Sequence, residues 1–173
     1  NENSAPHIEY THTLCDAWEA AARRAASHGI RVCLLRTGLV LAPDGGFLSR
    51  LLLPFKLGLG GPIGRGQQYM PWVHRDDMLG IIMQLMLNRQ ASGAYNAVAP
   101  NPVTNRAFSR SLGRALRRPA LLPLPPPLLK LALGEMSRLL LTGQRAVPDK
   151  LLQQGYMFRF SELETALDDV INH

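Results

Sequence analysis

The sequence of 173 residues has a formal net charge of +6, with 46% hydrophobic and 18% charged residues. This composition is typical of a folded globular protein and excludes a disordered, collagen-like or disulfide-rich chain. The most apolar stretch, 121–141, is interrupted by prolines and by charged residues, so no membrane span is expected. Cys15 and Cys33 fall in a predicted helix and a predicted strand, which favours reduced, packed thiols in a cytoplasmic protein over a disulfide.

The first predicted elements form a helix followed by a strand. Apolar residues recur at helical spacing over 13–27, and Thr13 with Asp16 predicts a capping box at the start of that helix. The nearly unbroken apolar run 30–35 predicts a parallel strand that is buried on both faces. We therefore expect an αβ unit of a layered α/β fold, with Leu14, Trp18 and Ala25 recurring at helical spacing on its helix.

The middle of the chain alternates helices, turns and one more strand. A turn at 43–46 precedes a helix at 47–56 and a glycine-rich loop at 58–66. A further helix is expected to begin at Asp76 or Asp77, either of which is a good N-cap, and to bury Met78, Ile81, Ile82, Leu85 and Met86. After a strand at 94–98, Thr104 is expected to cap a helix that buries Phe108, Leu112 and Leu116.

The character of the chain changes beyond Pro119, which predicts a domain boundary there. Residues 1–118 are interpreted as the second half of an α/β domain and 119–173 as a small helical C-terminal domain. This second domain is expected to contain a short extended piece at 120–124, a helix carrying Leu129, Leu133, Met136 and Leu140, and a helix from Pro148 to Gly155. A short strand at 158–160 and a last helix should follow, with Ser161 and Glu164 as its capping box and Leu163, Leu167, Val170 and Ile171 facing inward.

Most arginines are scattered along the sequence, and one local group stands out. Arg110, Arg114, Arg117 and Arg118 fall at i, i+4, i+7 and i+8 on one helix face. Cations near the C-terminus of a helix are favoured by its dipole. We therefore interpret the group as a solvated helix face and expect no nucleic-acid partner.

Two features that suggest chemistry have simpler interpretations. The loop at 58–66 follows a helix and opens no βαβ unit, so it does not meet the conditions for a dinucleotide-binding glycine fingerprint. It can still cover a ligand pocket in which Arg65 meets an anionic group. The second feature is His74 beside Asp76 and Asp77. No other histidine is placed to complete a metal site, so we favour one Asp as helix cap and His74 as a strand-end residue that bonds a loop.

The segment 35–43 comes directly after the predicted buried strand. In open α/β sheets, ligands bind beyond the carboxyl ends of the strands, so this turn is the expected place for a ligand. Arg36 at the end of that strand needs an acidic or ligand partner if it is buried.

In this order, six segments resemble the second half of the extended short-chain dehydrogenase/reductases, and within them the epimerase family proteins. The segments are 13–19, 34–43, 57–64, 72–77, 99–105 and 143–148. The resemblance implies a Rossmann-type parallel sheet with flanking helices, of which the first half, with the dinucleotide fingerprint, precedes residue 1. It also implies NADP or NAD as cofactor of the complete protein and a small-molecule substrate of the nucleotide-sugar kind.

The resemblance also assigns site residues. Extended members use a tyrosine and a lysine four residues apart on the helix that here spans 13–27; the tyrosine exchanges the proton at the reacting carbinol, and the lysine lowers the pKa of that tyrosine. Thr11 and Cys15 occupy those two positions here, so the usual catalytic pair is not preserved. The turn formed by Thr37, Gly38, Leu39 and Val40 is expected near the nicotinamide. The substrate side is expected to hold Arg36, Arg65, Trp72 and His74.

Three hypotheses for the function follow. The first is the C-terminal part of an NAD(P)-dependent epimerase or oxidoreductase, and the second is a dinucleotide-binding regulator without turnover, since some family members carry the label "cell division inhibitor". The third is a basic interaction module. A strand buried like the one predicted at 30–35 also needs partner strands, and this sequence does not supply them. This predicts either a homo-oligomer or a longer protein.

Overall fold

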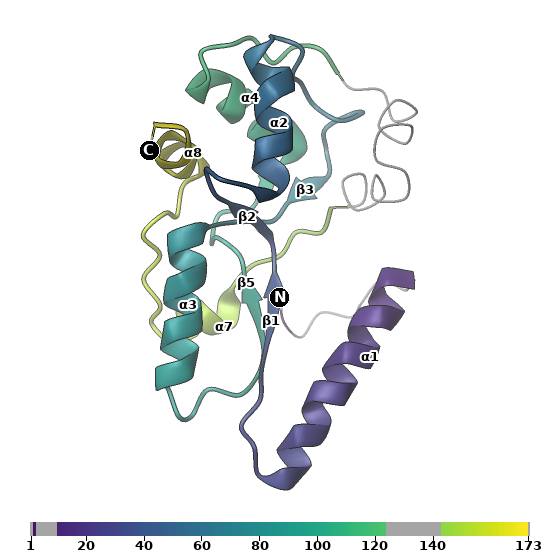
Figure 1. Ribbon diagram of the computed structural model, residues 1–173, viewed down its shortest axis with the longest axis vertical. Helices are drawn as coiled ribbons and strands as arrows, with labels where there is room; N and C mark the ends of the chain where they lie inside the picture. Colours follow the sequence, from purple (N-terminus) through teal and green to yellow (C-terminus); the bar gives the residue numbers. More distant parts are fainter. Residues whose placement is uncertain (1, 3–9, 124–142, 173) are drawn as a thin grey trace.

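The computed structural model describes residues 2, 10–123 and 143–172, and it has a mixed α/β architecture (Figure 1). Three two-stranded sheets form its centre. Strand β1 (Cys33–Thr37) pairs in parallel with β5 (Gly93–Ala97), and β2 (Leu39–Leu41) pairs in parallel with β4 (Trp72–His74). Strand β3 (Tyr69–Met70) pairs antiparallel with β6 (Val103–Thr104). The predicted parallel pairing of the first strand is therefore confirmed.

The helices lie close to where the hydrophobic periodicity predicts them. They are α1 (Tyr10–Arg24) with a 3-10 turn (Ala25–His28), α2 (Gly46–Lys56), α3 (Arg75–Leu87), α4 (Asn105–Ala115), α7 (Asp149–Gln153) and α8 (Leu163–Asn172). Thr104 caps α4 as predicted, because its hydroxyl accepts the backbone N–H of Ala107 at 3.3 Å. The helix predicted around Leu129 to Leu140 lies outside the described residues.

Two hydrophobic clusters form the core, and β4 lies between them. Trp72 belongs to a cluster with Leu41, Leu48, Phe108, Leu112, Leu163 and Leu167. The next residue, Val73, belongs to a second cluster with Ile81, Leu85, Tyr95 and Leu151. Successive side chains of a strand point to opposite faces, so β4 contributes to both. The first cluster joins residues from both sides of the predicted boundary at 118–119, and the two-domain division stays a prediction.

The first strand is less buried than the sequence pattern predicts, and the first helix leaves apolar residues exposed. Trp18 and Leu14 on α1 are 66% and 42% exposed. Strand β1 is half-buried at its start and exposed at its end, and within the described residues it pairs with β5 alone. Figure 1 shows α1 beside β1 and away from the other helices. Both α1 and β1 carry apolar residues, but the other described elements cover only part of their surfaces.

Several helix ends and one strand also differ from the predictions. Thr13 lies inside α1 and is not its cap, and Met86 is 69% exposed. The N-cap of α3 is His74 instead of an aspartate. Residues 158–160 form no strand, because the backbone amides of Arg159 and Phe160 donate to the carboxylate of Asp77 and not to a neighbouring strand. Cys15 and Cys33 are free thiols as predicted, although Cys15 is exposed and not packed.

In the part of the chain that is described, no helix is both long enough and apolar enough to cross a bilayer.

Candidate ligand-binding site

The turn Thr37–Val40, at the carboxyl end of β1, connects two of the parallel pairs. The backbone N–H of Gly38 donates to the carbonyl of Ala97 at 3.1 Å, and that of Leu39 donates to the carbonyl of Pro71 at 2.7 Å. A Cβ at Gly38 would lie 2.7 Å from the Pro71 oxygen, so only glycine fits there without displacing backbone. The turn is therefore tightly held, and Thr37 at its start is exposed.

Arg36, the residue before this turn, has the acidic partner that the sequence predicts. Its guanidinium donates to both carboxylate oxygens of Glu19 on α1, with Nε–Oε1 at 2.8 Å and Nη2–Oε2 at 3.0 Å. This bidentate pairing holds the pKa of the Glu19 carboxyl below its ordinary value and raises the pKa of Arg36. The pair joins α1 to β1 beside the turn, and it leaves Arg36 partly exposed on the open side of the strand.

The two positions that the resemblance assigns to a catalytic tyrosine and lysine, 11 and 15, both lie on α1. They stay a prediction. Cys15 is an exposed free thiol, and a thiol offers no ammonium group.

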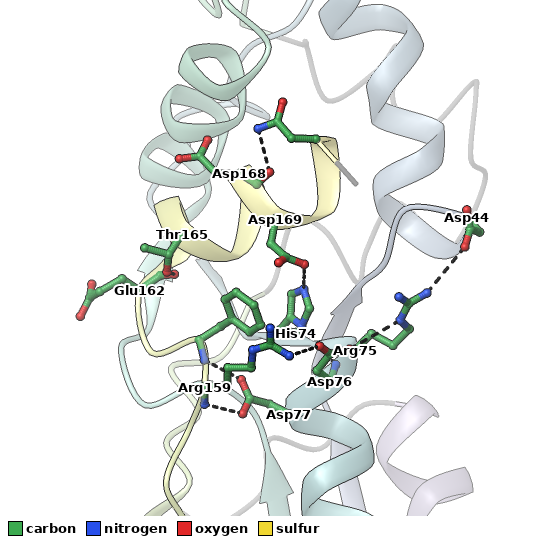
Figure 2. A network of polar contacts seen from close by, with 12 residues as sticks. Asp44, His74, Arg75, Asp76, Asp77, Arg159, Glu162, Thr165, Asp168 and Asp169 are labelled. Carbon is green, nitrogen blue, oxygen red and sulfur yellow. Dashed lines mark hydrogen bonds and ion pairs between the residues drawn. The ribbon is translucent and has the colours of Figure 1, made fainter.

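His74 is 2% exposed and forms a polar junction between three elements (Figure 2). Its Nδ1 accepts the backbone N–H of Asp76 at 3.1 Å, which places the ring proton on Nε2. That nitrogen faces Asp169 Oδ2 of α8 at 3.3 Å, and the ring lies 3.9 Å from the Phe160 ring, centroid to centroid. Burial lowers the pKa of His74, and this effect outweighs the opposing influence of Asp76, Asp169 and Asp77. Burial therefore favours the neutral form of the His74 ring.

Asp77 completes the junction, and sequence reasoning treated it only as a possible cap. It is 2% exposed, and its carboxylate accepts the backbone N–H groups of Arg159 at 2.8 Å and Phe160 at 2.9 Å (Figure 2). The hydroxyl of Tyr156 donates to the Asp77 carbonyl at 2.9 Å. No local pattern could have revealed these bonds, because the partners are about eighty residues apart in the sequence.

The remaining candidates lie in two other places. Trp72 is 1% exposed, and its indole N–H has no acceptor among the described residues. Arg65 is exposed in the glycine-rich loop and lies across a hollow from the arginines of α4. The structure thus brings Arg36 together with the Thr37–Val40 turn, buries Trp72 and His74 in the core, and places Arg65 in a separate hollow. The described residues contain no group of three or more His, Cys, Asp or Glu side chains that could hold a metal ion.

Comparison with curated proteins identifies relatives along almost the entire chain. The epimerase family protein SDR39U1 of Mus musculus is 42% identical over 166 residues, which is 95% of this chain and 56% of the mouse protein. The Homo sapiens protein of the same name is 40% identical, with 95% of this chain and 56% of its own length covered. Over the matched length, this chain is therefore similar to epimerase family proteins. It spans about half the length of these curated relatives.

One family model matches the C-terminal residues, and solved structures match almost the entire chain. Residues 124–170 match the model described as a domain of unknown function, DUF1731. The crystal structure of human epimerase family protein SDR39U1 (isoform 2) with NADPH superposes with a TM-score of 0.94 at 38% identity, covering 99% of this chain and 59% of that one. A nucleoside-diphosphate sugar epimerase from Corynebacterium glutamicum gives a TM-score of 0.79 at 29% identity, with 98% and 32% covered. The predicted Rossmann-type α/β fold and family resemblance are confirmed.

Proposed function

We propose that this chain is the C-terminal part of a protein that binds a nicotinamide dinucleotide, with NADPH as the preferred form, and that the Thr37–Val40 turn lies beside the nicotinamide. The single observation that carries the proposal is the parallel pairing of β1 with β5, which ends in a turn locked by Gly38. Ligands of open α/β sheets bind beyond such strand ends. The human relative with the matching fold has NADPH in its structure.

The residues of the turn fit such a ligand. The backbone N–H groups of Gly38 and Leu39 are already used within the protein, so the turn keeps its shape without a ligand. The exposed Thr37 hydroxyl is the polar group that it offers. When bound, the dinucleotide supplies or accepts a hydride. The chain supplies the rigid wall against which the nicotinamide is oriented.

The substrate side is part of the same proposal. Arg36 is an exposed cation that suits an anionic, nucleotide-sugar-like substrate. Arg65 was predicted on the same side, but it lies in the separate hollow and is left out of this site. Trp72 and His74 are buried, and we assign them to the wall beneath the site and not to substrate contact. The two free thiols favour a cytoplasmic setting for the protein.

A second candidate function is a dinucleotide-dependent regulator without turnover. It is favoured by the residues at 11 and 15, a threonine and a cysteine where the family has its tyrosine and lysine. Here the threonine replaces the group that exchanges the proton, and the cysteine supplies no ammonium group to lower its pKa. The regulator and the enzyme share the dinucleotide site and differ only in turnover.

Isothermal titration calorimetry of the full-length protein with NADPH and NADH tests the proposal. Binding of NADPH that weakens in a Thr37→Val variant, but not in a Thr165→Val variant of α8, is the expected result. Absence of binding by either dinucleotide would refute it. Oxidation of NADPH with a panel of carbonyl compounds then separates the two candidates, because turnover excludes the regulator.

A further inference from the structure

Six arginines surround one open hollow between α4 and the glycine-rich loop, away from the Thr37–Val40 turn. They are Arg65, Arg106, Arg110, Arg114, Arg117 and Arg118, and this set is called the arginine hollow below. Its volume is about 780 Å³, within the range of small-molecule pockets. The helix-face pattern in the sequence contains four of the six. Arg106 continues that pattern one turn earlier, and Arg65 joins it only through the fold.

The charge of the hollow is not balanced by its own lining. Among the described residues, no aspartate or glutamate lines it and none of the six arginines has an ion pair. By contrast, Arg23, Arg36, Arg75 and Arg159 all pair with carboxylates. Arg114 and Arg117 also line a neighbouring hollow that contains Glu164 and Asp168. The remaining four arginines line the arginine hollow and not this neighbouring one; they are Arg65, Arg106, Arg110 and Arg118.

The helix dipole explains only part of this arrangement. It favours cations in the last turn of a helix, where Arg114, Arg117 and Arg118 lie at or just beyond the end of α4. Arg106 and Arg110 are on the first and second turns, and Arg65 is on another element. Like charges gathered around one hollow repel each other unless an anion is present.

The backbone at Arg117 supplies a second, independent observation. Its φ is +54°, the only positive φ of a non-glycine residue among those described. The N–H of Arg118 donates to the Gly113 carbonyl at 2.8 Å, and that of Arg117 to the Arg114 carbonyl at 2.9 Å. This is the Schellman ending of a helix, in which glycine is the usual residue at the left-handed position. An arginine there costs backbone energy, and such strain accumulates at functional sites.

The walls of the hollow are also held together. The backbone N–H of Arg106 donates to the Gly66 carbonyl at 2.9 Å, and its side chain donates to the Arg65 carbonyl at 3.0 Å. A Cβ at Gly66, where φ is +66°, would lie 2.9 Å from the Arg106 Cβ. The loop that carries Arg65 is thus docked on the start of α4, which fixes the backbone of Arg65 relative to that of Arg106.

We propose that the arginine hollow binds a small anion made of two or more linked phosphates. Guanidinium groups match phosphate oxygens in bidentate geometry. Five of the six cations follow one face of α4 and its C-terminal end, and Arg65 on the glycine-rich loop lines the same hollow. The wall also contains apolar residues such as Pro62, Pro119 and Ala120. This shape suits a compact oligophosphate better than a nucleic-acid strand. The site shares only Arg65 with the residues expected on the substrate side, so it stands or falls independently of the dinucleotide proposal.

Calorimetry of the full-length protein with inorganic tripolyphosphate tests the site, with ATP as a second arm to distinguish a nucleotide source from inorganic phosphate. The variant Arg110→Gln with Arg118→Gln is expected to weaken tripolyphosphate binding by about tenfold. The matched control, Arg50→Gln with Arg89→Gln, removes the same charge from exposed positions outside the hollow and should change Kd by less than about twofold. Absence of binding, or an equal loss in the control, overturns the proposal. Binding of single-stranded RNA with the same variant dependence, and none of tripolyphosphate, also overturns it.

The strain at Arg117 allows a second test with opposite effects on stability and binding. Arg117→Gly places glycine at the left-handed position, so Tm should rise by about 3 °C while tripolyphosphate binding weakens. Arg118→Gly removes the same charge where φ is not positive, so it should weaken binding and lower Tm. A merely structural role for Arg117 predicts the rise in Tm with unchanged binding, and that result overturns the proposal.

Discussion

Replacing Asp77 with asparagine removes one of two carboxylate oxygens that hold the segment before α8. Asp77 is 2% exposed, and its oxygens accept the backbone N–H groups of Arg159 and Phe160, with a longer contact of 3.3 Å to the Tyr156 hydroxyl. The asparagine side chain keeps one oxygen as acceptor, but its NH2 group takes the place of the other oxygen. That NH2 group then faces one of the two backbone N–H groups, and both are donors. One buried donor is left unpaired as a result.

The magnitude follows from these bonds. A hydrogen bond to a charged group contributes about 1.5–3 kcal/mol, and an unpaired buried donor costs about 1–3 kcal/mol. We expect Asp77→Asn to lower the free energy of unfolding by about 2–3 kcal/mol. Asp77→Ala loses every contact of the carboxylate and should cost about 4 kcal/mol, a large share of the 5–15 kcal/mol typical of a domain.

Urea denaturation followed by far-ultraviolet circular dichroism at pH 7 measures both values. The matched control is Asp76→Asn, which removes the same charge from the same first turn of α3. Asp76 is 35% exposed, and its ion pair with Arg159 at 2.9 Å lies at the surface, so the loss should stay below about 1 kcal/mol. If Asp77→Asn is no more destabilising than Asp76→Asn, the assigned role of the buried carboxylate is wrong.

Three further predictions concern the same fold. The free energy of unfolding should fall as pH drops from about 7 to about 5, because burial lowers the pKa of His74 in the folded state and the unfolded chain then binds the extra proton. His74→Asn keeps a capping side chain and should flatten this pH dependence, as measured by urea titrations at each pH. An unchanged pH dependence in this variant would contradict the assignment. Gly38→Ala should destabilise by about 2 kcal/mol, since its Cβ would overlap the Pro71 carbonyl, and a neutral effect in thermal melts would show that the turn can relax. The 173-residue chain alone should self-associate through the open side of β1 and the exposed Trp18, so a monomer by light scattering would argue against that expectation.

Local interactions explain the elements that the sequence predicts well. Each of these features involves residues within one or two helical turns of each other. They are the Thr104 cap, the left-handed glycine after α7 and the helical periodicity of apolar residues in α4 and α8. The ordered motifs are equally local, and they were sufficient to predict the resemblance to epimerase family proteins and the Rossmann-type fold. Arg36 was expected to need a partner, and Glu19 on the preceding helix provides it.

The features that only the tertiary structure decided depend on contacts between distant residues. His74 and not an aspartate caps α3, because the ring is buried between that helix and Asp169 of α8. Residues 158–160 form no strand, because Asp77, about eighty positions earlier, takes their backbone donors. The arginine hollow likewise needs the loop of Arg65 docked on α4. Hydrophobic periodicity and capping preferences describe neighbours along the chain, whereas these sites are set by which buried polar groups find a partner across the fold.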